Sequence, residues 1–234
     1  MTSALLPCAI IVARCSSQRL PGKVLRQVHD RPMLRYVVEK VSRCACIGSI
    51  CVATSDDPSD DPVADYCQEN NLACVRGDLH DVAARVLKAA EVMDADCFFR
   101  VNGDSPLLGM ELLERAWKVF QSAQPDLVSN IHPRTFPPGA SVELISRSAM
   151  RRAVAAMSDP ADREHVTRYF YQHADHFRIE NLLSDRDYAG VHLAVDSPAD
   201  FTLLESVVKR MDRPHWEYSL SQTVDLYLEA AAHG

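Results

Sequence analysis

The chain has 234 residues, of which 47% are hydrophobic and 24% charged, and a formal net charge of −7. This composition is typical of a globular domain and excludes collagen-like, coiled-coil and disordered chains, while the negative charge argues against nonspecific binding to a nucleic-acid backbone. The longest apolar stretch, residues 5–13, is too short to span a membrane and follows no basic segment, so we expect neither a membrane span nor a secretory signal.

The first half of the chain alternates short apolar runs with amphipathic segments. Strands are expected at residues 9–13, 47–53, 72–75, 97–101 and 126–130, and helices at 32–43, 61–69, 81–93 and 111–121. The repeated strand–helix order predicts an α/β fold, with a mostly parallel sheet flanked by helices. The strands lack a strict polar–apolar alternation, as expected when both faces of the sheet are covered.

The second half breaks this rhythm at the proline-rich segment 133–139. Strands are expected at 141–145, 177–182 and 192–195, helices at 148–157 and 162–172, and a further helix begins with a capping-box sequence at 197–200. No linker is long enough to separate two domains. We therefore predict a single domain over residues 1–234, in which residues 131–190 form a protruding subdomain.

All eight cysteines lie within the first 97 residues. They form no CxxC motif and no Cys/His set with zinc-finger spacing. We expect free, mostly buried thiols in a reducing compartment, and hence a cytoplasmic protein.

A basic loop follows the first strand, at the edge of the sheet where open α/β proteins bind their ligands. It carries Arg14, Arg19 and Lys23 together with Ser16 and Ser17. Three cations with hydroxyl groups and exposed amides suit a polyphosphate, although the loop could also be merely solvated. It matches neither GxGxxG nor GxxxxGK[ST], so neither a dinucleotide site nor a P-loop is indicated.

Two aspartates, Asp104 and Asp196, follow apolar strands, and each precedes a Ser-Pro pair. If both reach the edge that carries the basic loop, they could hold Mg²⁺, which prefers carboxylate and phosphate oxygens. Each could instead only cap the turn or helix that follows it. Their joint occurrence opposite a basic loop favours the metal site.

These segments resemble the cytidylyltransferase family that includes CMP-Kdo and CMP-sialic acid synthetases, most closely its branch named for the spore coat polysaccharide biosynthesis protein F. The family's opening pattern ARxxSxRLPGKxL matches residues 13–25, its GDxP strand end matches residues 103–106, and its VD[ST]PxD matches residues 195–200. The segments 134–143 and 163–167 also match that branch. The resemblance runs from about residue 8 to residue 208.

The resemblance implies a nucleotide-diphospho-sugar transferase-like fold, which is GT-A or Rossmann-like. It implies a Mg²⁺-dependent enzyme that transfers CMP from CTP to a hydroxyl of a sugar acid or similar acidic acceptor and releases pyrophosphate, in surface polysaccharide or glycan precursor synthesis. The catalytic residues it implies are Arg19, Lys23, Asp104 and Asp196, of which the two aspartates hold Mg²⁺. The nucleotide contacts it implies are Ala13 and Arg14, whose backbone reads cytosine, the loop side chains of Arg14, Ser16, Ser17, Arg19 and Lys23, and further Arg76 and Asp81.

The acceptor site is expected in the second half, at Arg134, Glu143, Arg163, Glu164 and His165. The segment 131–190 resembles the family's dimer arm, which implies a homodimer. Two residues depart from the family patterns. Ser16 stands where the branch commonly has glycine, and Asn102 replaces the glutamine that touches the sugar in the sugar-acid synthetases, so the identity of the acceptor stays open.

Three alternatives remain at this stage. A sugar-1-phosphate nucleotidyltransferase for UTP or another base normally has a glycine-rich opening loop, which this chain lacks. A glycosyltransferase of the same fold normally shows DxD, where this chain has Asn-Gly-Asp at 102–104. A nucleotide-binding sensor or scaffold without turnover is the third.

Overall fold

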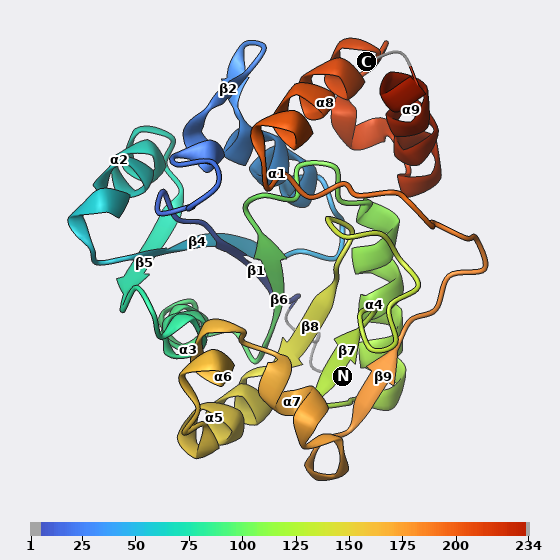
Figure 1. Ribbon diagram of the computed structural model, residues 1–234. Coiled ribbons are helices and arrows are strands. Elements are labelled where there is room, and N and C mark those ends of the chain that lie inside the picture. Colours follow the sequence, from blue (N-terminus) through green and yellow to red (C-terminus); the bar gives the residue numbers. More distant parts are fainter. Residues whose placement is uncertain (1–5, 233–234) are drawn as a thin grey trace.

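The computed structural model describes residues 6–232, which form one seven-stranded sheet with helices on both faces (Figure 1). The strand order is β5-β4-β1-β6-β8-β7-β9. The strands are β1 (Cys8–Val12), β4 (Ser49–Ser55), β5 (Ala73–Gly77), β6 (Cys97–Asn102), β7 (Leu127–Ser129), β8 (Glu143–Ser146) and β9 (Ile179–Asn181). Only β8 runs antiparallel to its neighbours, so the predicted mostly parallel sheet is confirmed.

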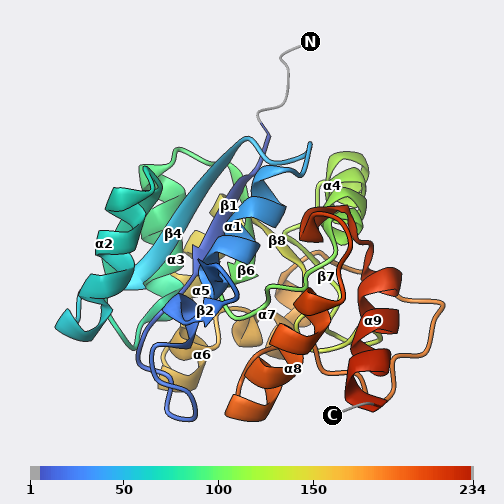
Figure 2. The ribbon, with the colours of Figure 1, turned by 90° about the horizontal axis from the view of Figure 1, so that it is seen from above.

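The helices divide between two hydrophobic cores, one on each face of the sheet (Figures 1 and 2). One core contains α1 (Met33–Ser42), α2 (Asp61–Glu69), α4 (Met110–Ala123), α8 (Pro198–Lys209) and α9 (Leu220–Ala232). The other contains α3 (Val82–Val92), α5 (Arg147–Ala156) and α7 (Arg168–Gln172), while α6 (Pro160–Glu164) packs on α3.

The packing of the central strand β1 explains why its sequence is apolar throughout. Ala9 and Ile11 belong to the first core, and Cys8 and Ile10 belong to the second. Because successive side chains of a strand point to opposite faces, both sets are buried only when helices cover both faces. The predicted strands and helices of the first half are confirmed, with their ends shifted by at most two residues.

Two predictions for the second half are wrong in detail. The helix expected at 162–172 is split into α6 and α7, because the backbone leaves helical geometry at His165 (φ −101°, ψ 64°). The strand expected at 192–195 lies outside the sheet. This extended segment instead donates hydrogen bonds from Leu193 N to Pro138 O (2.7 Å) and from Val195 N to Asp104 O (3.0 Å).

Residues 131–190 were expected to protrude, but they supply β8 and β9 to the central sheet. Helices α5 and α6 from the same segment pack on α3, so most of it belongs to the main body. The physical reason is the buried face of β8, whose residues Leu144 and Ile145 fill opposite cores. The dimerisation role of this segment stays a prediction.

The small hairpin β2 (Gln27–Val28) and β3 (Arg31–Pro32) and the helix α9 were not predicted. All eight cysteines are free thiols, and six of them are buried. Within residues 6–232, no helix combines the length and the apolar character that a membrane span requires.

Candidate active site

A cleft of about 920 Å³ lies at the carboxyl ends of β1 and β6. Its walls come from the loop after β1, the segment at the start of α3, the end of β6, and the turn after α6. Asp196, which precedes α8, also lines it. The cleft therefore lies where parallel strands deliver their loops, the edge at which the sequence predicts ligand binding.

The centre of the cleft is a lysine held between two carboxylates. Lys23 Nζ lies 2.9 Å from Asp104 Oδ2 and 3.2 Å from Asp196 Oδ1, and it donates to Val195 O at 2.7 Å. Arg19 Nη2 lies 3.2 Å from the same oxygen of Asp196. The structure thus brings together the four residues that the sequence places at the edge of the sheet, although 81 and 173 positions separate Lys23 from the two aspartates.

The basic loop is fixed by backbone contacts on its inner side. Gly22 adopts a left-handed conformation (φ 69°) that starts the short helix η1 (Lys23–Leu25), and its amide donates to Cys15 O at 2.8 Å. The amide of Cys15 in turn donates to Asp60 Oδ1 at 2.6 Å. Asp60 is fully buried and also accepts hydrogen bonds from the amide and hydroxyl of Ser55. This buried carboxylate anchors the loop to the end of β4.

Asp196 is positioned by the first turn of α8. Its amide donates to Asp200 Oδ2 at 3.0 Å, and Ser197 and Asp200 form the predicted capping box. Burial acts to raise the pKa of Asp196, but the hydrogen bond and charge of Lys23, with Arg19 and His192, outweigh it and hold that pKa below its ordinary value. Asp196 is therefore ionised at neutral pH.

The predicted residues of the second half are placed in different surroundings. Glu164 and His165 line the cleft, and Arg14 Nη2 lies 3.3 Å from Glu164 Oε1. Arg163 donates to the carboxylate of Asp81 and to Met157 O (2.8 Å), and this contact ties α6 to the start of α3. Asp81 is the predicted cap of α3, since it accepts from Ala84 N at 2.9 Å.

Five predicted residues lie outside the lining of the cleft, namely the paired Asp81 and Arg163 together with Arg76, Arg134 and Glu143. Arg76 is held by Asp61 (2.6 Å) and by Ser55 O (2.8 Å). Arg134 donates to Ser141 and lines a separate cavity of about 620 Å³. Glu143 is 1% exposed and lies behind Arg100, so it faces protein groups.

Sequence reasoning missed several residues of the site, among them two arginines and a histidine next to Asp196. Arg85 and Arg100 line the cleft, and His192 Nε2 lies 3.5 Å from Asp196 Oδ2. Arg100 could have been noticed, because an arginine inside an apolar strand must find a partner. Arg85 and His192 give no such signal, since one sits in an amphipathic helix and the other next to a turn.

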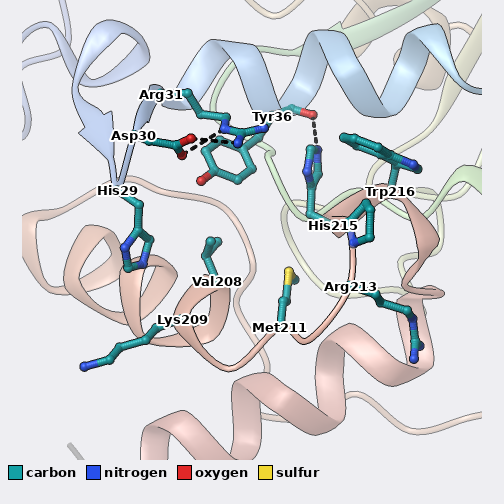
Figure 3. Close-up of a pocket in the computed structure, with 11 residues that line it drawn as sticks. His29, Asp30, Arg31, Tyr36, Val208, Lys209, Met211, Arg213, His215 and Trp216 are labelled. Atoms are coloured by element: carbon teal, nitrogen blue, oxygen red, sulfur yellow. Dashed lines mark hydrogen bonds and ion pairs between the residues drawn. The ribbon is translucent and has the colours of Figure 1, made fainter.

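Figure 3 shows another cavity, of about 440 Å³, formed by the β2–β3 turn, α1, the end of α8 and residues 213–216. Arg31 in this cavity is paired with Asp30 (2.8 Å) and Glu39 (3.1 Å). His215 contacts Tyr36 O through Nε2 at 2.9 Å. None of the site residues predicted from the sequence lines this cavity.

Comparison with known proteins gives consistent results. The family model described as cytidylyltransferase matches residues 8–231. The chain is 26% identical over 226 residues to the spore coat polysaccharide biosynthesis protein SpsF of Bacillus subtilis, and the match covers 93% of this chain and 92% of that protein. It is 35% identical over 116 residues to a 3-deoxy-manno-octulosonate cytidylyltransferase of Acinetobacter baumannii, a match that covers only 47% of this chain and 44% of the other.

The fold agrees with solved structures. A cytidylyltransferase from Leptospira borgpetersenii superposes with a TM-score of 0.90 at 24% identity, over 97% of this chain and 96% of that chain. This likeness establishes the nucleotidyltransferase fold, and the family model establishes the membership. The chain belongs to the cytidylyltransferase family.

Proposed function

We propose that this chain transfers CMP from CTP to a hydroxyl of a sugar acid or similar acidic small molecule and releases pyrophosphate, in the synthesis of a surface polysaccharide or glycan precursor. The observation that carries the proposal is the position of Lys23 between Asp104 and Asp196 in the cleft. The names of the relatives support it, since they include a 3-deoxy-manno-octulosonate cytidylyltransferase and a spore coat polysaccharide protein. We propose no nucleic-acid partner for this chain.

The cations of the basic loop act on the triphosphate. In this proposal Lys23 and Arg19, which line the cleft beside Asp104 and Asp196, neutralise the charge that grows on the leaving pyrophosphate, and Arg14, which also lines the cleft, contributes to this. Because these groups are held in place before the substrate binds, they stabilise the transition state with little reorganisation. Ser16 and Ser17 line the cleft beside them.

The two aspartates fit a divalent cation shared with the phosphates. One carboxylate oxygen of each aspartate contacts Lys23 Nζ. The other oxygen is less tightly held, since Asp104 Oδ1 lies 3.4 Å from the Ser105 hydroxyl and Asp196 Oδ2 lies 3.5 Å from His192 Nε2. Among residues 6–232 no group of three or more His, Cys, Asp or Glu side chains could hold a metal ion. Two carboxylates completed by substrate oxygens are a typical Mg²⁺ set. When bound, Mg²⁺ would neutralise the α-phosphate and help to align the attacking hydroxyl.

The proposal also includes a homodimer, a cytoplasmic location and an acceptor site beside Glu164 and His165. Eight free thiols favour a reducing compartment.

The family resemblance of segment 131–190 and the exposed Leu183 within it (49%) support a dimer contact there. Sedimentation of the purified protein tests this contact, and a monomer at micromolar concentration would contradict it.

A pyrophosphate-release assay tests the reaction. Each nucleoside triphosphate is supplied with Mg²⁺ and a panel of sugar acids and phosphonates, and we expect release from CTP with at least one acceptor. Asp196→Asn and Lys23→Ala should each lower the rate by about 10²–10³ with the fold intact. Lys209→Ala is the matched control, since this lysine lies at the other cavity. Normal turnover in both site variants would contradict the proposal, and CTP binding without release would favour a sensor.

A further inference from the structure

The ammonium group of Lys23 spends all of its hydrogen-bond donors on protein groups. A protonated lysine has three N–H donors, and Lys23 Nζ has three acceptors, namely Val195 O at 2.7 Å, Asp104 Oδ2 at 2.9 Å and Asp196 Oδ1 at 3.2 Å. The proposed function requires a contact between Lys23 and the triphosphate. This contact can form only if Nζ gives up at least one of its three acceptors.

The two aspartates and their two cations form a cluster without net charge. Lys23 Nζ contacts one oxygen of each carboxylate, and Arg19 Nη2 also lies 3.2 Å from Asp196 Oδ1. Two positive charges therefore balance two negative ones. A divalent cation that approaches alone meets the Lys23 ammonium at the same carboxylates, so repulsion by the ammonium offsets attraction by the aspartates. We expect the protein by itself to bind a divalent cation weakly.

The side chain of Lys23 can exchange acceptors without a change in the fold. Its backbone belongs to the short helix η1, whereas its stem is flexible and its donors rotate. Lys23 lines the cleft together with Ser16 and Ser17, on the loop that faces the triphosphate in the proposed function. Phosphate oxygens are charged acceptors like the carboxylates that they would replace, and Val195 O remains as a fixed partner.

We propose that Lys23 exchanges its two carboxylate acceptors for phosphate oxygens when the nucleotide binds together with its divalent cation. Asp104 and Asp196 are then free to ligate that cation, while Val195 O still holds Nζ. The exchange precedes the chemical step, so Lys23 is in place when charge develops on the pyrophosphate. The inference rests on the proposed function, and it adds that the metal site of this chain forms only with the nucleotide.

Binding of Mn²⁺ alone to the full chain, followed by electron paramagnetic resonance, tests the balance of charge. Lys23→Met keeps the length of the side chain but removes its charge, and it should bind Mn²⁺ about 10–100-fold more tightly than the wild type. Lys209→Met is the matched control, since this lysine lies at the other cavity, and it should bind Mn²⁺ like the wild type. Adding Asp104→Asn to Lys23→Met should remove the gain, which would assign the bound ion to the aspartates.

Binding of the Mn²⁺–CTP complex, measured by calorimetry without an acceptor, tests the exchange itself. Lys23→Met should bind this complex about 10–100-fold more weakly than the wild type, because the phosphates lose a charged donor. Opposite effects of one substitution on the metal and on the metal–nucleotide complex are the expected result.

Two results would overturn the inference. The first is no gain for Mn²⁺ alone, or a gain that persists with Asp104→Asn, because Lys23 would then not shield the aspartates. The second is unchanged or tighter binding of the Mn²⁺–CTP complex, because Lys23 would then stay with the aspartates when the nucleotide binds.

Lys23→Gln covers the case in which Lys23→Met does not fold. Its amide keeps a donor for Val195 O but carries no charge, so the same opposite effects are expected, and urea unfolding checks both variants. Neither binding measurement depends on turnover. If the wild type releases no pyrophosphate, the proposed reaction fails, whereas the opposite effects would still support the exchange. Turnover with CTP but without the opposite effects would support the reaction and overturn the exchange.

Discussion

At the scale of single residues, the wall of the cleft depends on a buried ion pair. Arg100 donates through Nη1 to Glu143 Oε2, and the other oxygen of Glu143 accepts from Thr167 (2.5 Å) and Tyr171 (3.2 Å). Burial and the charge of Glu143 raise the pKa of Tyr171, so its hydroxyl stays a donor. Arg100 on β6, Thr167 in the turn before α7 and Tyr171 on α7 therefore hold this carboxylate in place.

Removing the cation of this pair should be costly. We expect Arg100→Met to lower the free energy of unfolding by about 3–5 kcal/mol, because it leaves a buried carboxylate without a counter-charge. The double variant Arg100→Met/Glu143→Leu should be more stable than Arg100→Met, since it removes the stranded charge as well. Urea unfolding measures all three proteins. A loss below about 1 kcal/mol in the single variant would mean that the pair is not buried as described.

The residues of the site were predictable to different degrees. Lys23 and Asp104 could be found because the loops that follow the parallel strands β1 and β6 share one edge of the sheet. Asp196 was assigned to that edge from a strand at 192–195 that lies outside the sheet, and it reaches the cleft because Val195 N donates to Asp104 O at 3.0 Å. Glu143 could not, because its burial depends on Thr167 and Tyr171 packing over β8. Arg85 could not either, because a helix pattern does not reveal which polar residue meets another segment.

At the scale of elements, the N-terminus of α8 positions Asp196. Asp200 Oδ2 accepts from Asp196 N (3.0 Å), Ser197 N (2.8 Å) and Ser197 Oγ (2.8 Å). Asp200→Ala should cost about 1–2 kcal/mol of stability, as loss of a helix cap does. It should also lower kcat about 10–100-fold, because it frees the backbone that carries Asp196.

Ser146→Ala is the control for this capping variant. Ser146 caps α5 by accepting from Ala149 N at 3.2 Å. It pairs with Cys97 at the start of β6, which is the opposite edge of the sheet from the cleft. Unfolding and steady-state kinetics should therefore show a similar loss of stability without a loss of rate. Equal rates in Asp200→Ala and the wild type would contradict a positioning role for Asp200.

The extended segment before α8 depends on a glycine in the proline-rich turn. Gly139 has a φ of +89°, and a Cβ there would lie 2.3 Å from Ala194 N. Gly190 has a similar φ of +75° but open space around it. Gly190→Ala should cost about 1–2 kcal/mol from backbone strain alone. Gly139→Ala should cost at least about 2 kcal/mol more and displace the segment toward Asp196. Comparable melting temperatures in the two variants would show that the contact is not tight.

Tertiary contacts between elements also explain which strand and helix predictions were wrong. Periodicity located the first-half elements well, since each buries a complete face. The break between α6 and α7 places Thr167 beside Glu143, and residues 193–195 bond to Pro138 and Asp104 rather than to a strand. Tertiary contacts determine both features, and such contacts cannot be read from the local sequence pattern.

At the scale of the whole molecule, a buried histidine in the segment between α8 and α9 contacts the helix α1. His215 follows α8, and its Nε2 lies 2.9 Å from Tyr36 O on α1 (Figure 3). Burial lowers the pKa of His215 to about 4, with the charges of Lys40 and Arg31 acting in the same direction and the Tyr36 contact and Glu39 opposing them. The ring is therefore neutral in the folded protein at neutral pH.

This histidine should make folding stability depend on pH. An unfolded histidine binds a proton below about pH 6.5, whereas the folded ring does so only near pH 4. The unfolded state thus binds more protons between these values, so stability is complete above about pH 6.5 and falls as the pH drops, by on the order of 3 kcal/mol. His215→Gln keeps a donor for Tyr36 O but does not titrate, and its stability should fall less over this window. Urea unfolding between pH 4.5 and 8 measures the difference, with the exposed His176→Gln as control. Parallel pH profiles for the wild type and His215→Gln would rule out this origin of the acid sensitivity.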